Sequence, residues 1–144
     1  MITVTRRLEF DYGHRVLGHE GKCKHLHGHR GVAEVTVKGP RLDEVGRVVD
    51  FGEVRRLVGG WVDDHWDHNL LLNPADPLLC VVGFGDHHGR EAFEMPVGNP
   101  TAENMAECLY HIASSLLFPK GLTVVKVRMW ETPSCYADYE PSPA

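Results

Sequence analysis

Hydrophobic and polar residues alternate along the first dozen positions of the chain. In residues 2–12, Val4, Leu8 and Phe10 fall on one side, while threonine and charged residues fall mostly on the other. A period of two predicts a β-strand with one buried face. The same period returns in the stretch that runs to about Lys38, which predicts a second strand after a long loop over residues 13–30 that is rich in Gly, His and Lys.

Two later segments repeat their apolar residues every three or four positions, as amphipathic helices do. Asp50 is placed to cap the first helix, and Asn-Pro-Thr101 supplies the starting signals of the second. Pro119 and Gly121 end the second helix. The predicted apolar faces contain Phe51, Val54, Val58 and Trp61 in the first helix and Met105, Leu109, Ile112 and Leu116 in the second.

The segment between the two helices has a weaker pattern. Leu70–Leu72 form a short apolar run that Asn-Pro closes. Residues 80–98 are Gly-rich and poorly patterned, which predicts a surface excursion containing a short strand at 91–95.

The order of the elements predicts the fold class. A last long strand is expected over 122–131, with Val125, Val127, Met129 and Glu131 on one side. A fourth strand is expected either in the remainder of 122–139 or in 90–97. Strand–strand–helix–helix–strand order is typical of an α+β fold, with an antiparallel four-stranded sheet and two helices on one face. One domain is expected over residues 1–144, ending in a disordered tail from about 140.

Composition narrows the classes of partner. The formal charge of −5 and a pI near 6.0 argue against nucleic acid or an anionic membrane as the main partner. No run of apolar residues reaches the roughly 18 needed to span a membrane, and the first strand lacks the apolar core of an export signal. The four cysteines are widely spaced, without a CxxC pair. We therefore expect free thiols and a cytoplasmic location.

Ten histidines are the unusual feature of the composition. The segment 23–29 reads Cys-Lys-His-Leu-His-Gly-His. Residues two apart in an extended chain point to the same side, so His27 and His29 can reach one ion. Neutral imidazoles suit zinc, and three protein ligands leave a fourth position open for water or substrate. A catalytic zinc site is the predicted chemistry.

The spacing of the histidines does not decide which of them is the third zinc ligand. His25 has the same parity as His27 and His29, whereas His14 lies at the end of the first strand, where an antiparallel neighbour would bring it alongside. A further interpretation is that these are surface histidines of a polar loop that bind no metal.

Cys23 and the Asp67-His68 pair are the candidate acid–base groups. Lys22, Lys24 and a nearby metal ion would lower the pKa of the Cys23 thiol and favour the thiolate. The alternatives are a fourth zinc ligand, which would close the site, or an inert thiol. A carboxylate beside an imidazole can fix its tautomer and form a proton relay, although neighbours in a chain need not touch.

Taken together, these residues resemble the 6-pyruvoyltetrahydropterin synthase family, and most closely its bacterial branch, the 6-carboxytetrahydropterin synthases of queuosine biosynthesis. Three residues separate Cys23 from His27, as in that branch. The motifs that carry the resemblance are 10–15 (Phe-Asp-Tyr-Gly-His-Arg), 23–29, Val49-Asp50-Phe51, Asp67-His68 with 71–73 (Leu-Leu-Asn), 99–104 (Asn-Pro-Thr-Ala-Glu-Asn) and Glu131-Thr132.

The resemblance implies an assembly and a ligand set. It selects His14 as the third zinc ligand and makes His25 a bystander. It also implies the tunnelling fold, in which the sheets of several subunits join into a barrel and active sites form between subunits. The expected assembly is a homo-oligomer, commonly a hexamer in this family.

The resemblance further implies a reaction. The substrate would be 7,8-dihydroneopterin triphosphate, converted to 6-carboxytetrahydropterin, acetaldehyde and triphosphate. Zinc would act as Lewis acid, Cys23 would abstract a side-chain proton, and Asp67 and His68 would transfer protons on the other side. Glu131 would accept hydrogen bonds from the pterin ring. The remaining residues expected to bind substrate are Thr101, Glu103 and Thr132.

Charge alone adds Lys22, Lys24 and Arg30 as candidates for the phosphates. Two other functions are compatible with the sequence. One is a pyruvoyltetrahydropterin synthase or a related pterin side-chain lyase, and the other is a zinc- or pterin-binding protein without turnover.

Overall fold

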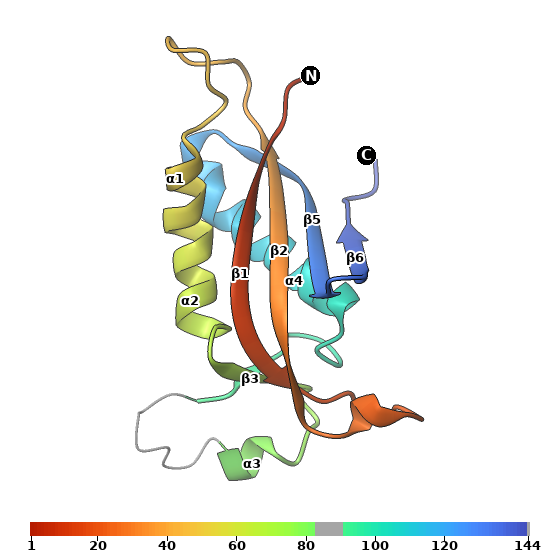
Figure 1. Cartoon of the computed structure of the whole chain (residues 1–144). Helices are drawn as coiled ribbons and strands as arrows, with labels where there is room; N and C mark the ends of the chain where they lie inside the picture. Colours follow the sequence, from red (N-terminus) through yellow and green to blue (C-terminus); the bar gives the residue numbers. More distant parts are fainter. Residues whose placement is uncertain (83–90, 144) are drawn as a thin grey trace.

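The computed structural model describes residues 1–82 and 91–143. In it, the chain folds into a twisted sheet that packs against two long helical stretches (Figure 1). The strand order is β4-β3-β1-β2-β5-β6. The strands are β1 (Val4–His14), β2 (His27–Lys38), β3 (Asn69–Leu72), β4 (Phe93–Glu94), β5 (Thr123–Thr132) and β6 (Cys135–Tyr139).

The prediction of an α+β fold is confirmed, but the prediction of a four-stranded antiparallel sheet is wrong. The described residues form six strands, and β3 pairs with β1 in parallel, as β4 does with β3. Both candidate positions for a fourth strand contain one, namely β4 and β6. The pattern missed β3 because four residues are too few to show a period of two, and its last two residues are both buried.

The β1–β2 hairpin is the centre of the sheet. Its antiparallel register runs from Val4 opposite Val37 to His14 opposite His27. As the sequence predicts, alternate residues of β1 from Leu8 onward face the core. This register carries the histidines of the two strands to the same end of the sheet.

The first helical stretch begins at the predicted cap, where the Asp50 carboxylate accepts the Gly52 N–H at 2.7 Å. Its buried face contains Val54, Val58 and Val62, whereas Phe51 is 51% exposed. The prediction that Phe51 lies in the core is therefore wrong, because a side chain in the first turn leans past the N-terminal end of the helix. The stretch comprises α1 (Phe51–Val54), a π-helical turn η2 (Arg55–Gly59) and α2 (Gly60–His65).

The second long helix, α4 (Ala102–Leu117), begins where the sequence predicts. The Thr101 hydroxyl accepts the Asn104 N–H at 3.3 Å, which satisfies one free donor of the first turn. Leu117 is fully buried, while Leu116, which the sequence places on the apolar face, is only half-buried. Three short helical segments complete the described chain: η1 (Lys22–Lys24), α3 (Leu79–Val82) and η3 (Phe118–Lys120).

A β-bulge changes the predicted face of β5. The pairing with β2 shifts between Thr36 and Val37, so Val124 and Val127 are both buried. Val125 therefore lies outside the alternation that places it with Val127 on one side, because a bulge adds one residue to one strand.

The two ends of the 80–98 excursion are α3 and β4, and residues 83–90 lie outside the described part of the chain. Residues 140–143 are exposed and have no helix or strand. Disorder of the tail stays a prediction. No helix in residues 1–82 and 91–143 is both long enough and apolar enough to cross a membrane.

Candidate metal centre and acid–base pair

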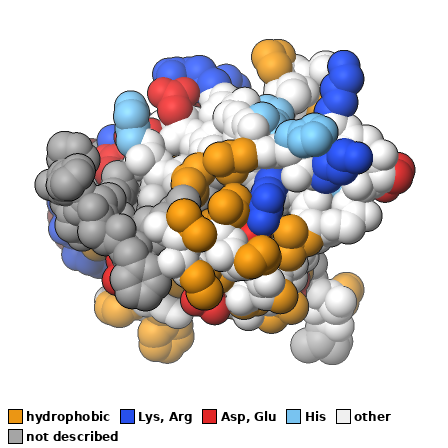
Figure 2. All heavy atoms as spheres, turned by 90° about the horizontal axis from the view of Figure 1, so that it is seen from below, with side chains coloured by type: hydrophobic (Ala, Val, Ile, Leu, Met, Phe, Trp, Pro, Cys, Tyr) orange, Lys and Arg blue, Asp and Glu red, His pale blue; other side chains and the backbone are white. Residues whose placement is uncertain are grey.

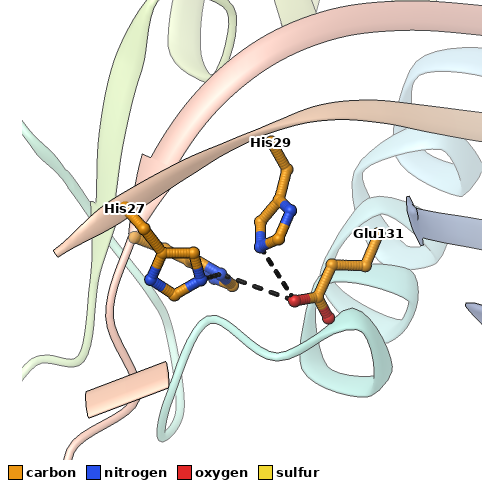
Figure 3. A group of neighbouring side chains, drawn as sticks. His27, His29 and Glu131 are labelled. Carbon is orange, nitrogen blue, oxygen red and sulfur yellow. Dashed lines mark hydrogen bonds and ion pairs between the residues drawn. The ribbon is translucent and has the colours of Figure 1, made fainter. Parts of the chain in front are cut away.

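Three histidines and one carboxylate converge at the end of the central hairpin (Figure 3). His14 ends β1, His27 and His29 begin β2, and Glu131 comes from β5. One ligand atom from each of the four lies within 4.8 Å of the others. The structure thus brings together the three predicted histidines, and adds a carboxylate that the sequence did not predict as a metal ligand.

The spacing of these atoms fits a tetrahedral ion. Ligands about 2.1 Å from zinc at tetrahedral angles are about 3.4 Å from one another. The Nε2 atoms of His14 and His27 are 3.1 Å apart, and Oε1 of Glu131 is 3.7 Å from Nε2 of His14. The four atoms therefore surround a space of the size that a zinc ion requires.

Backbone carbonyl groups fix the tautomers of two of these imidazoles. Nδ1 of His14 is 2.7 Å from the oxygen of Pro100, and Nδ1 of His27 is 2.6 Å from the oxygen of His25. A carbonyl oxygen only accepts, so each Nδ1 carries the proton and each neutral ring presents a lone pair at Nε2. Two lone pairs 3.1 Å apart repel each other, and a cation between them removes the conflict.

His29 supports the same interpretation. Its Nε2 is buried, and Oε1 of Glu131 lies 2.9 Å away from it. Burial is the main cause that lowers the pKa of His14 and of His29 below the usual value of an imidazole. Both rings are therefore held in the neutral form that binds metal ions.

His25 and Cys23 lie outside this group. His25 is exposed and its ring is not among the clustered ligand atoms of the described residues. Cys23, half-buried in η1, is also outside, which argues against the alternative that its thiol is the fourth ligand. The loop that carries Cys23 is closed by the Val16 N–H, which donates to the Cys23 carbonyl at 2.8 Å.

The side chains of Asp67 and His68 are in contact, which their adjacency in the sequence did not by itself establish. Oδ2 of Asp67 is 2.9 Å from Nδ1 of His68, and Oδ1 accepts the N–H of Asp11 at 2.9 Å. His68 has a φ of 55°, an uncommon value for a residue other than glycine, and its N–H donates to the Asp11 carbonyl. Its ring is 73% exposed. A carboxylate thus orients an imidazole that faces solvent, as a proton-transfer group requires.

The other residues predicted to bind substrate lie in different surroundings. Glu131 and Thr132 line a cavity of about 460 Å³ together with His29 and Arg30, a size that fits a small molecule. Thr101 uses its hydroxyl as a helix cap, and Glu103 is exposed in the first turn of α4.

Arg30, predicted as a phosphate ligand, is already paired. Its guanidinium lies 3.1 Å from Glu9 and 3.2 Å from Asp11. A phosphate would have to compete with two carboxylates at this position. Lys22 and Lys24 are exposed on the loop beside Cys23.

Sequence reasoning missed the residues that hold this loop. Asn99 clamps the peptide of Leu17, accepting its N–H at 2.9 Å and donating to its carbonyl at 3.0 Å. Arg15 makes two hydrogen bonds to Asp76, a carboxylate that is only 2% exposed. The buried Asp76 was not singled out because nothing in its local sequence marks it as buried.

Comparison with known proteins agrees with this geometry. The family model described as 6-pyruvoyl tetrahydropterin synthase matches residues 3–142. The chain belongs to this family. A curated relative from Rickettsia bellii (strain RML369-C), named 6-carboxy-5,6,7,8-tetrahydropterin synthase, is 41% identical over 143 residues that cover 96% of this chain and 99% of the relative. A relative of the same name from Haemophilus influenzae (strain ATCC 51907 / DSM 11121 / KW20 / Rd) is 25% identical over 144 residues, covering 97% and 99%.

Solved structures confirm the fold of the single chain. The 6-pyruvoyl tetrahydropterin synthase of Caenorhabditis elegans superposes with a TM-score of 0.70 at 24% identity, over 98% of this chain and 96% of that one. An uncharacterized protein from Wolinella succinogenes gives a TM-score of 0.82 at 24% identity, over 98% of both chains. The predicted resemblance to this family of pterin synthases is therefore confirmed.

Proposed function

We propose that this member of the family is a zinc-dependent 6-carboxytetrahydropterin synthase, which converts 7,8-dihydroneopterin triphosphate to 6-carboxy-5,6,7,8-tetrahydropterin, acetaldehyde and triphosphate. The observation that carries the proposal is the convergence of His14, His27 and His29, two of them with the tautomer that aims Nε2 at a common point. The names of the curated relatives supply the substrate class.

Zinc at this centre would supply Lewis-acid polarisation of the oxygens on the substrate side chain. Cys23 would abstract a proton from that side chain, as a base next to the metal site. His68, oriented by Asp67, would transfer a proton on the opposite side of the substrate. Glu131 and Thr132, in the cavity beside His29, would bind the pterin ring, with Glu103 and Thr101 at the start of α4 completing the site.

A homo-oligomer, with a hexamer as the expected size, completes the proposal. The Asp67–His68 pair belongs to a group of side chains separate from the three histidines in the described chain, so a neighbouring subunit would bring one group to the other. The short strand β4 and the strand β6 form the two edges of the sheet and offer unpaired backbone groups. Hydrophobic side chains also gather at the end of the molecule seen in Figure 2. A barrel of joined sheets would pair such edges.

The proposed setting is the cytoplasm and queuosine biosynthesis, as the family resemblance implies, and the free thiols of the four cysteines are compatible with a reducing compartment. Neither nucleic acid nor a membrane is proposed as a partner.

Product analysis tests the reaction. Zinc-loaded protein is incubated with 7,8-dihydroneopterin triphosphate and the pterin product is identified by mass spectrometry. The proposal requires 6-carboxytetrahydropterin and acetaldehyde. A 6-pyruvoyl product would assign the related synthase activity, and no product at all would leave a zinc- or pterin-binding protein.

Substitution of Cys23 tests the proposed base. Cys23→Ala should abolish turnover while bound zinc remains at wild-type stoichiometry, because the thiol lies outside the histidine group. Cys135→Ala is the matched control, since this exposed cysteine lies on β6 and should leave turnover unchanged. Loss of zinc from Cys23→Ala would contradict the assignment of Cys23 as a base.

A further inference from the structure

We propose that Glu131 occupies the fourth coordination position of the metal in the substrate-free protein and leaves it when the pterin binds. This inference rests on the proposed function, which gives Glu131 to the pterin ring. It assigns one carboxylate two successive partners.

The position of the carboxylate is that of a ligand. Oε1 of Glu131 is 2.9 Å from Nε2 of His29 and 3.7 Å from Nε2 of His14, on either side of the roughly 3.4 Å edge of a tetrahedral zinc site. Figure 3 shows the Glu131 carboxylate directed toward the imidazole of His29.

The charge balance supports the same conclusion. Within residues 1–82 and 91–143, the ion pairs of Glu131 are with His14 and His29 alone, and no lysine or arginine neutralises it. A carboxylate with only 27% of its side chain exposed and no lysine or arginine beside it is stabilised by a cation. A divalent metal supplies that charge.

An irregularity in the sheet gives Glu131 freedom to move. On one side of β5, Trp130 pairs with Tyr136 and Thr132 pairs with Cys135, so the register shifts at Glu131 and leaves it without a partner in β6. Such irregularities redirect a side chain and recur beside active sites. A change in the side-chain contacts of Glu131 therefore breaks no backbone pair with β6.

The two roles exclude each other. A carboxylate oxygen bound to the metal is not available to accept the amino and ring N–H groups of a pterin. Substrate that enters the cavity would take the metal position through its side-chain hydroxyl groups, and the freed Glu131 carboxylate would accept the pterin donors. The exchange keeps the metal four-coordinate before substrate arrives and couples opening of the site to recognition of the ring.

The test compares Glu131→Gln with Glu34→Gln in the full-length protein. Glu34 is a matched control, since it lies on the adjacent strand β2 and its side chain is also 27% exposed. Zinc affinity is measured by competition with a chelator, and the protein is then loaded with Co²⁺ to record the visible absorption of the metal. Loss of a residue that only supports the metal ligands commonly costs about 10–100-fold in metal affinity. Glu131→Gln should therefore weaken zinc binding at least about 10-fold and change the Co²⁺ spectrum. Glu34→Gln should do neither.

The exchange is tested on the wild-type Co²⁺ protein by adding 7,8-dihydroneopterin, whose binding is followed independently by calorimetry. Saturating pterin should change the Co²⁺ spectrum. Wild-type zinc affinity and spectrum in Glu131→Gln would overturn the coordination, and a spectrum unchanged at saturation would overturn the exchange. Absence of calorimetric binding would instead refute the proposed substrate class, leaving the coordination to be judged on Glu131→Gln alone.

Discussion

Removal of the metal should lower the stability of the fold, because the three histidines are arranged to hold a cation. Without a cation, the lone pairs of His14 and His27 face each other across 3.1 Å, and His14 is only 1% exposed, so water cannot separate them easily. Free zinc at 1,000 times its dissociation constant stabilises a native state by about 4 kcal/mol. For a domain of this size each kcal/mol corresponds to about 2–4 °C, so zinc should raise the melting temperature by about 8–16 °C.

Scanning calorimetry in a metal buffer measures this shift directly. In His14→Ala the shift should largely disappear, and the metal-free variant should itself lose about 1–3 kcal/mol, because the Pro100 carbonyl loses its donor. His25→Ala is the matched control, since His25 is exposed on the neighbouring loop and contributes only its backbone oxygen to His27. A shift that persists in His14→Ala but vanishes in His25→Ala would refute the ligand set, and equal melting temperatures with and without zinc would refute the site.

Three further predictions concern the framework of the site. Gly31→Ala should cost about 1–3 kcal/mol in urea unfolding, because its added methyl carbon would lie 2.8–3.0 Å from three core side chains; an unchanged midpoint would contradict this packing. Arg15 lowers the pKa of Asp76, so the excess stability of wild type over Asp76→Asn should be complete above pH 3.8 and decline as the pH falls below it; a difference constant down to pH 2 would contradict the pairing. Asn99→Ala should speed hydrogen exchange of the Leu17 amide by about 5-fold or more, since a lost hydrogen bond is worth about 1 kcal/mol or more; wild-type exchange would show that the clamp is dispensable.

The central hairpin could be read from the sequence because both strands are long enough to show their period. β1 and β2 have eleven and twelve residues, and most of each strand shows the alternation. The predicted loop over 13–30 nevertheless contains the end of β1 and the start of β2, because glycine and histidine give this stretch no apolar period. The shared parity of His27 and His29 holds for any extended segment. Parity could not choose between His14 and His25, because that choice depends on a register set by the whole hairpin, and the structure places His14 directly opposite His27.

Glu131 shows what a linear pattern cannot supply. Its neighbours in space are more than a hundred residues away in the chain, and its approach to them depends on the pairing of β5 with β2. The short strand β3 was missed for a different reason, since a segment of four residues is compatible with several conformations. Asn99 and Asp76 act through contacts with distant loops, which local sequence does not encode.

Zinc X-ray absorption on the purified, untagged protein directly tests whether the three imidazoles bind a metal ion. We expect one zinc per chain, with three imidazole nitrogens and one oxygen at about 2.0–2.2 Å and no sulfur in the coordination sphere. A sulfur at about 2.3 Å would place Cys23 on the metal and remove it as a base. A protein that holds no zinc even after incubation with the ion would contradict the convergence of the three imidazoles on a metal.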